Sequence, residues 1–544
     1  MKFNKILLTV FAGLALVACS DIDYIVPEGG TMLASQVQET NLIAPSRAEA
    51  AFTGMFTNIG QPALMYSTPD DWQFLMINFC NDLEGADAHM PNSNYNWFST
   101  CGEYSSRTPS YRNPYIRYRA PYNMIANVNT FLQGYNIEEA DDHALNMIAQ
   151  AYTLRAYSYL SLAPYFQFGY TVNPDAVSVP IVTPETPDFT QNPRASLRDI
   201  YTFIVDDLTK AIEILEKSPE QRTSKAFIDA TVAHGLRARA YMNMNDWSNA
   251  LADAQAAQKG YTPATIAEVS VPSFYDISEH NWIWGYDMTV SAAEVYPYAT
   301  TSGWLRSFSG DGYSPATQCY CMINTLLYNQ IPDTDVRKGW WVDEDLYSPL
   351  IEGMTWPGCT PPDVAHASDG GNSKLPYLPY TNVKFGCISV GTVTNDEDAP
   401  LMRVEEMILN EAECYANLNQ DAQAIQVLEN FVRTYRDPAY KVANSPRNLK
   451  DEIWFQRRVE LWGEGFFVGD ARRLNKPIVR FLGTPESTNM ADAFRFNIAP
   501  DDPWLLMRFP QGETNTNYGV VDNEGGHMPT VDQNPGLRDG VTEF

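Results

Sequence analysis

Seven charged side chains fall within seventeen positions near the end of the chain, in the segment EIWFQRRVELWGEGFFVGDARR (452–473). They are Arg457, Arg458, Glu460, Glu464, Asp470, Arg472 and Arg473. Acids and bases this close together could exchange protons with a substrate. No nearby histidine or serine completes a nucleophile–base set, however. The pattern therefore favours ion pairs among these residues, which would fix the segment to the rest of the fold.

Aromatic side chains gather in two segments, where flat rings could stack on the apolar faces of sugars. The first segment is NSNYNWFSTCGEY, residues 92–104. The second runs from 274 to 341 and holds fourteen aromatic residues in 68, about a fifth, against 12% for the whole chain. Rings with polar or glycine neighbours are the candidate ligand contacts. They are Tyr95, Trp97, Tyr296, Trp304 and Tyr313.

Other rings of the second segment have a structural pattern. Trp282, Trp284 and Tyr286 occupy alternate positions, which predicts a strand. We expect Trp282 and Trp284 to lie in the core. Trp304 and Tyr313, in TTSGWLRSFSGDGYS, are instead expected on a surface loop, with the Trp304 ring exposed as a platform for a sugar.

Three functions are open to these residues. Asn, Asp, Arg and Tyr beside the rings would bind the polar rim of a glycan, while aromatic pockets would also serve peptide capture. A glycoside hydrolase needs two carboxylates at a fixed separation. Asp311 and the WVDEDL segment (341–346) place acids beside aromatic residues, but nothing marks out a pair. We expect a binding protein and not an enzyme.

Charge and composition exclude several partners. The chain has 544 residues and a formal net charge of −29. Its pI near 4.5 argues against nucleic acid, because phosphate binding needs a basic face. None of the eight cysteines forms C-x-x-C, and the six histidines include no HExxH. We therefore expect no zinc site and no cofactor; calcium binding and disulfide pairing stay open.

The N-terminus has the pattern of a secretory signal. Lys2 and Lys5 precede an apolar run over 6–17, which is shorter than the about 20 residues that cross a bilayer. The L-V-A-C that follows resembles the lipobox of bacterial lipoproteins, which implies cleavage before Cys19 and acylation of its thiol. We predict a signal peptide over 1–18 and an anchor and tether over 19–43, so that lipid would hold the protein to a membrane. The run Ser20, Asp21 and Asp23 resembles surface-export signals of such lipoproteins, which implies exposure on the outer face of the outer membrane.

Helical periodicity dominates much of the mature chain. In SLRDIYTFIVDDLTKAIEIL (196–215), Ser196 and Asp199 are predicted to cap a helix with one apolar stripe. ARAYMNMNDWSNALADA (238–254) and AECYANLNQDAQAIQVL (412–428) share a pattern of small residue, aromatic residue, polar turn and small residue. Such a repeat is typical of tetratricopeptide helix pairs.

The predicted fold is mainly α, in a single domain over 44–544. A tetratricopeptide-like helix-pair scaffold is expected over about 44–260 and 400–480. A long, loop-rich and aromatic-rich insertion with few short strands is expected over about 261–400, where Gly, Pro, Trp and Tyr are frequent. The C-terminal loops are expected over 481–544.

The charged segment also carries a family resemblance. Its R-R-x-E-L…E-G…D-x-R-R pattern resembles the C-terminal signature of the SusD/RagB family, and LMRVEEMILNEAECYANLNQ (401–420) and QNPG (533–536) resemble other parts of it. Gln456 and Phe467 depart from the pattern, which usually has Glu and Arg there. The resemblance implies a nutrient-binding outer-membrane lipoprotein beside a SusC-like TonB-dependent transporter. The aromatic insertion is not a family motif, so the ligand, glycan or peptide, stays open.

Overall fold

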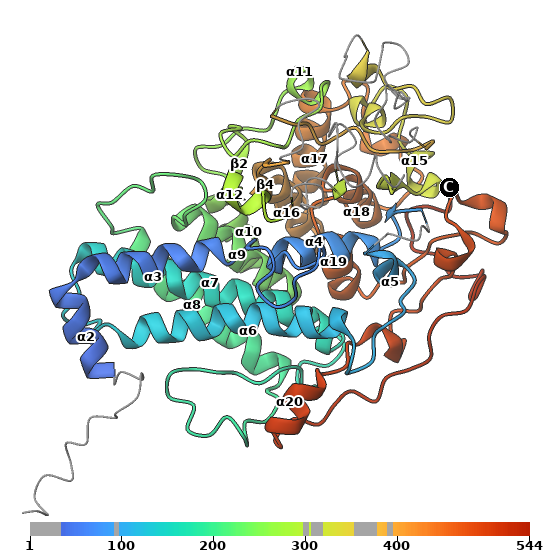
Figure 1. The fold of residues 1–544 in the computed structure, drawn as a ribbon. Helices are drawn as coiled ribbons and strands as arrows, with labels where there is room; N and C mark the ends of the chain where they lie inside the picture. The colour runs from blue at the N-terminus through green and yellow to red at the C-terminus, as the bar shows by residue number, and fades with distance from the viewer. Residues whose placement is uncertain (1–33, 92–96, 297–303, 306–318, 353–377, 389–394) are drawn as a thin grey trace, which may run out of the picture.

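Helices make up most of the regular structure of the chain (Figure 1). The computed structural model describes residues 34–91, 97–296, 304–305, 319–352, 378–388 and 395–544. The longer helices are α2 (Ala34–Ile43), α3 (Pro45–Thr57), α4 (Gln73–Leu83), α6 (Arg112–Gln133), α7 (Asp142–Phe166), α8 (Leu197–Leu215), α9 (Ala230–Asn243), α10 (Trp247–Ala257), α16 (Val404–Asn417), α17 (Asp421–Tyr435), α18 (Leu449–Glu460) and α19 (Phe467–Arg473).

Consecutive helices pack as pairs. Helix α7 packs on both α6 and α8, α9 packs on α8 and α10, and α16 packs on α10, α17 and α18. Figure 1 shows α3, α6, α7 and α8 side by side in the left part of the view, with α16 to α18 above them and to the right. Ser196 caps α8 as predicted, since its Oγ accepts a hydrogen bond from the Asp199 backbone N–H at 3.1 Å. The mainly α, tetratricopeptide-like prediction is confirmed.

The two sequence repeats fold in the same way. Asn245, between α9 and α10, and Asn419, between α16 and α17, both adopt a left-handed conformation, with φ of 58° and 59°. Asparagine tolerates this conformation better than most residues, so each can end one helix and turn the chain into the next. Ala238 and Ala412 are fully buried, and side chains of this size let neighbouring helices approach closely.

Short strands connect the aromatic region to the scaffold. Strand β2 (Trp282–Tyr286) pairs antiparallel with β4 (Ala399–Arg403), and β1 (Ala88–His89) pairs with β3 (Met322–Ile323). Trp282 and Trp284 are completely buried, which confirms the predicted core strand. β4 runs directly into α16, so the sheet is continuous with the helix pair that follows it.

Shorter elements complete the described chain. The short α-helices are α5 (Ser99–Gly102), α11 (Ile266–Val269), α12 (Val290–Ala293), α15 (Thr325–Tyr328) and α20 (Gln511–Thr516). The 3-10 helices are η2 (Val336–Trp340), η3 (Pro349–Ile351), η5 (Val442–Asn444), η6 (Pro485–Ser487), η7 (Asp492–Phe494) and η8 (Pro503–Leu505). Among the described helices, none has the length and apolar character needed to cross a membrane.

Candidate ligand-binding site

Two aromatic rings and a guanidinium form a stack at the start of α6. The Cζ atom of Arg112 lies 5.1 Å from the centre of the Trp97 ring and 5.9 Å from the centre of the Tyr66 ring. Tyr115, one turn along α6, meets Tyr66 edge to face with ring centres 5.4 Å apart. All four side chains are only partly buried. We call these four residues, together with Asp70, the Trp97 cluster.

The loop before α4 is held in a defined conformation and positions two members of the cluster. The Asp71 carboxylate accepts hydrogen bonds from the backbone N–H groups of Met65 (2.7 Å) and Tyr66 (2.6 Å). Ala63 and Gln73, on either side of this stretch, adopt left-handed conformations with φ of 57° and 51°. Such conformations cost energy in residues other than glycine and tend to occur at functional sites.

An ion pair sets the charge of the cluster. Arg112 Nε lies 2.9 Å from Asp70 Oδ2, and the Arg112 side chain keeps 34% of its surface exposed. Burial raises the pKa of Asp70, and the Arg112 charge opposes that rise. Arg112 is the first residue of α6, where a cation is disfavoured by the helix dipole. The contacts with Asp70 and the two rings, and not the helix dipole, therefore account for an arginine at this position.

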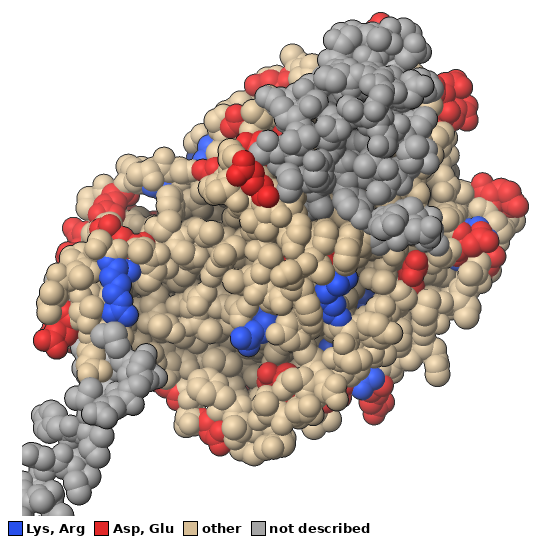
Figure 2. Space-filling model, in the orientation of Figure 1, with Lys and Arg blue, Asp and Glu red and all other residues tan. Residues whose placement is uncertain are grey.

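The cluster presents an aromatic platform with polar groups at its edge. Flat, partly exposed rings offer contact area to an apolar face, and guanidinium and carboxylate groups offer hydrogen bonds beside it. Figure 2 shows that the middle of the face carrying α4 and α6 is mostly uncharged, with isolated Lys and Arg side chains. The arrangement suits a neutral ligand with alternating apolar and polar surfaces.

The predicted contact residues do not all lie in one place. Trp97 lies in the cluster. Tyr95 and Tyr313 fall outside the described residues, and Tyr296 is partly buried and packs against the core just after α12. Sequence reasoning missed the other cluster members, although YRNPYIRYR (111–119) does combine tyrosines with arginines.

Trp304 contradicts its prediction. Its ring is completely buried and meets Phe98 edge to face with ring centres 5.0 Å apart. Phe98 in turn packs on Phe79 of α4 at 4.9 Å. The expectation of an exposed platform was wrong because the residue types next to a side chain in the sequence do not determine what covers it in the folded protein. Trp304 thus packs on the ring of Phe98, which follows Trp97 in the sequence.

Three residues of the charged segment pair with one another and with the scaffold. Arg457 Nε lies 3.0 Å from Asp470 Oδ2, and Arg473 Nε lies 2.8 Å from Asp470 Oδ1. Arg473 also forms an ion pair with Glu413 of α16. These contacts join α18, α19 and α16.

The other members of the segment bind partners far along the chain. Arg458 pairs with Asp87 (2.5 Å) and Asp539 (2.6 Å). Glu464 pairs with Arg403 and with Lys384, both at 2.8 Å. Glu460 is surrounded by arginines. Its ion-pair partners are Arg337, Arg403 and Arg436. Arg472 is the exception, because it donates only to the Leu505 carbonyl oxygen at 2.8 Å among the hydrogen bonds of the described residues.

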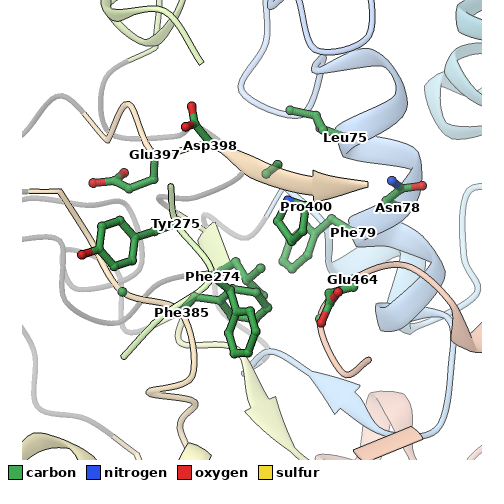
Figure 3. Close-up of a pocket in the computed structure, with 14 residues that line it drawn as sticks. Leu75, Asn78, Phe79, Phe274, Tyr275, Phe385, Glu397, Asp398, Pro400 and Glu464 are labelled. Carbon is green, nitrogen blue, oxygen red and sulfur yellow. The ribbon is translucent and has the colours of Figure 1, made fainter. Parts of the chain in front are cut away.

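A small cavity lies between α4, β4 and the segment around Phe274 (Figure 3). Its volume is about 60 Å³, well below the roughly 300–1,000 Å³ of ordinary ligand pockets. Asp398, at one side, accepts hydrogen bonds from the backbone N–H groups of Ile277 and Met288, and burial raises its pKa to about 6. The cavity is too small for a sugar ring.

Metal and thiol chemistry receive no support from the part of the chain described. Within it, no three His, Cys, Asp or Glu side chains are grouped as metal ligands. Cys80, Cys101, Cys321 and Cys414 are free thiols, and the sulfur atoms of Cys80 and Cys101 are 3.0 Å apart.

Comparisons with known proteins give a consistent picture. A family model described as "Starch-binding associating with outer membrane" matches residues 49–242, and the SusD family model matches residues 358–536. A SusD-like protein of Formosa agariphila is 21% identical over 409 residues, which cover 68% of this chain and 74% of that protein.

Solved structures show the same fold. A SusD-like carbohydrate binding protein from Bacteroides vulgatus superposes with a TM-score of 0.70 at 23% identity, covering 88% of this chain and 97% of that one. A SusD superfamily protein from Bacteroides thetaiotaomicron gives a TM-score of 0.66 at 18% identity, covering 88% and 99%.

Proposed function

The chain belongs to the SusD/RagB family, and on that premise we propose that it is a glycan-binding lipoprotein that passes its ligand to a transporter. It would capture an oligosaccharide or polysaccharide at the cell surface without cleaving it. The observation that carries the proposal is the Trp97 cluster, where partly exposed rings lie next to an ion pair. A B. vulgatus protein with the same fold is described as carbohydrate binding.

The chemistry of a sugar fits this cluster. The C–H face of a pyranose ring would lie on Trp97 or Tyr66, and its hydroxyl groups would exchange hydrogen bonds with Arg112 and Asp70. Because Arg112 is already paired with Asp70, the site has little free charge. A neutral glycan is therefore favoured over a strongly charged one.

Calorimetry with one aromatic variant tests the proposal. The mature chain is titrated with a panel of neutral and charged oligosaccharides and with peptides, and products are analysed for cleavage. Trp97→Ala should weaken the binding of the best glycan by about 2 kcal/mol, as expected for an aromatic hot spot. Tyr518→Ala removes a ring that is 71% exposed elsewhere and is the matched control. Equal affinities of Trp97→Ala and the parent protein would refute the assignment.

The location is proposed from the N-terminal sequence. Cys19 lies outside the described residues, and the L-V-A-C around it resembles a lipobox. The family model that matches 49–242 is described as associating with the outer membrane. We expect Cys19→Ser to release the protein from the membrane fraction or to leave it uncleaved. Protease treatment of intact cells should digest the parent protein if it is exposed on the outer face.

A TonB-dependent transporter is the proposed partner. One surface that could receive it carries exposed apolar side chains: Phe189 (60% exposed), Tyr518 (71%) and Val521 (76%). The two chain segments are joined, because the Tyr518 backbone N–H donates to the Thr190 carbonyl oxygen at 2.8 Å. Exposed apolar side chains that gather in this way often mark an interface. Co-purification of a transporter from outer membranes, lost in Phe189→Asp, tests this step.

A further inference from the structure

Four buried arginines lie around one buried carboxylate near the end of α19. Arg107, Arg117, Arg472 and Arg480 are between 0% and 8% exposed, and Glu84 is 1% exposed. Glu84 Oε1 lies 2.7 Å from Arg117 Nη2 and 3.0 Å from Arg107 Nη1. One negative charge thus serves two cations, and two more cations have no carboxylate partner in this group.

Arg480 is satisfied by neutral groups. It donates to the backbone carbonyl oxygens of Leu83, Gly85, Gly102 and Phe494 at 2.6–3.1 Å. Its guanidinium also lies over the rings of Tyr104 and Phe496. These dipoles and ring faces provide hydrogen-bond acceptors, but they do not neutralise the charge.

Arg107 and Arg472 share one backbone acceptor. Both donate through Nη2 to the Leu505 carbonyl oxygen, at 3.0 and 2.8 Å. The Nε of Arg107 and the Nη1 of Arg472 are buried, and neither has a hydrogen-bond partner among the residues that the structure describes. Both residues line one cavity, together with Glu84, Tyr104 and Tyr165. A buried donor without a partner is costly, so an acceptor is expected in this cavity.

The pKa values of neighbouring arginines indicate that the surroundings of this cavity lack negative charge. Burial lowers the pKa of Arg472 and of Arg480 to about 10, because nearby negative charge does not offset the cost of desolvation. Arg473 is buried as well, but Asp470 and Glu413 outweigh that cost and raise its pKa above the usual range. A water molecule would satisfy the free N–H groups of Arg107 and Arg472 and leave this charge uncompensated.

The size of the cavity limits the ligand. Its volume of about 10 Å³ leaves room for one small particle. A monatomic anion therefore fits better than phosphate, sulfate or a carboxylate. We infer that this cavity is a binding site for one halide ion, chloride in natural media, held by Arg107 Nε and Arg472 Nη1.

The ion would connect parts of the protein that are far apart in sequence. Arg107 lies in the chain between α5 and α6, and Arg472 lies in α19. Tyr104 and Ser106 of the first segment adopt left-handed conformations, with φ of 55° and 56°. The halide would thus stabilise the strained segment that leads to Arg112 and the Trp97 cluster. This inference does not depend on the proposed glycan ligand.

Anomalous diffraction on the mature protein tests the site directly. Crystals grown or soaked in sodium bromide should show an anomalous peak between Arg107 and Arg472. A water molecule in that place, or bromide only at the protein surface, would overturn the inference.

Thermal melting in solution provides a second test. At constant ionic strength, chloride should raise the melting temperature along a saturable curve relative to gluconate, which is too large for the cavity. Arg472→Met should abolish this difference. Arg495→Met, which removes an ion pair with Asp492 and Asp532 on another part of the protein, should keep it. Equal melting temperatures of the parent protein in both salts would contradict a halide site.

Discussion

Replacing Glu460 by glutamine should destabilise the protein through the arginines that surround this residue. Glu460 is completely buried. Its Oε2 lies 2.8 Å from Arg436 Nε, its Oε1 lies 3.2 Å from Arg403 Nη1, and its Oε2 lies 3.3 Å from Arg337 Nη1. Glutamine keeps the shape of the side chain and removes the charge, so the change reports mainly on electrostatics.

The magnitude follows from what each arginine keeps. Arg337 retains Asp335 at 2.6 Å, and Arg403 retains Glu464 at 2.8 Å. Among the described residues, Arg436 retains Glu405 as its one ion-pair partner, at 3.2 Å. The loss in the free energy of unfolding therefore comes mainly from Arg436, and is about 3–5 kcal/mol, the value for breaking one buried pair. The other two arginines keep strong partners, so they add little to it.

The pH dependence has a definite sign. Burial alone would raise the pKa of Glu460, but Arg436, Arg403 and Arg337 outweigh it and hold this pKa well below its usual value of 4.5. A carboxylate with a lowered pKa stabilises the fold above its unfolded-state pKa, and this contribution is lost as the pH falls. The free energy of unfolding of Glu460→Gln should lie below that of the parent protein by the whole loss of about 3–5 kcal/mol at pH 7 and by less at pH 3.

Urea denaturation of both proteins at the two pH values measures this difference. Glu138→Gln changes an exposed glutamate and should have little effect. Glycan affinity of the folded Glu460→Gln protein should change little. Stability of Glu460→Gln equal to that of the parent protein at pH 7 would refute the assignment of a structural role to this network.

Three other predictions concern buried residues. Trp304→Ala should lower the free energy of unfolding by about 3–5 kcal/mol, because it opens a cavity beneath Phe98; unchanged melting would mean that the ring is not packed in solution. Arg458→Ala should cost a similar amount by leaving the Asp87 and Asp539 carboxylates unpaired, and chemical denaturation would detect it. Burial raises the pKa of Asp82 to about 8, so its contribution to stability is present below its unfolded-state pKa, near 4, and is lost as the pH rises through about 8. The melting temperature of Asp82→Asn should accordingly fall less between pH 6 and pH 9 than that of the parent protein, and identical slopes would argue against a protonated Asp82.

Local patterns were sufficient for several elements of the fold. The cap at Ser196, the paired turns at Asn245 and Asn419, and the buried strand with Trp282 and Trp284 all follow from residues close together in sequence. The family assignment also depended on a short segment, 452–473, and was supported by the family models. Helical period, capping and strand alternation repeat within a few residues, so the amino-acid order alone carries them.

The candidate site was predictable only in part. Trp97 could be selected for its polar neighbours. Its contact with Arg112 could not, because 15 positions separate them and only the course of the chain between α5 and α6 brings them together. Trp304 was wrongly placed at the surface for a related reason: the sequence around it is rich in Gly, Ser and Thr, and the ring that covers it, Phe98, comes from a distant segment.

The sequence by itself determined which segments are helical, which family the chain belongs to, and that a cluster of charges lies at 457–473. Only the tertiary structure decided the partners of those charges. Arg458 binds Asp87, 371 positions away, while Arg472 has no carboxylate partner among the described residues and lines a cavity instead. The physical reason is that the energy of an ion pair depends on the distance between the two charges in space and not on their separation along the chain.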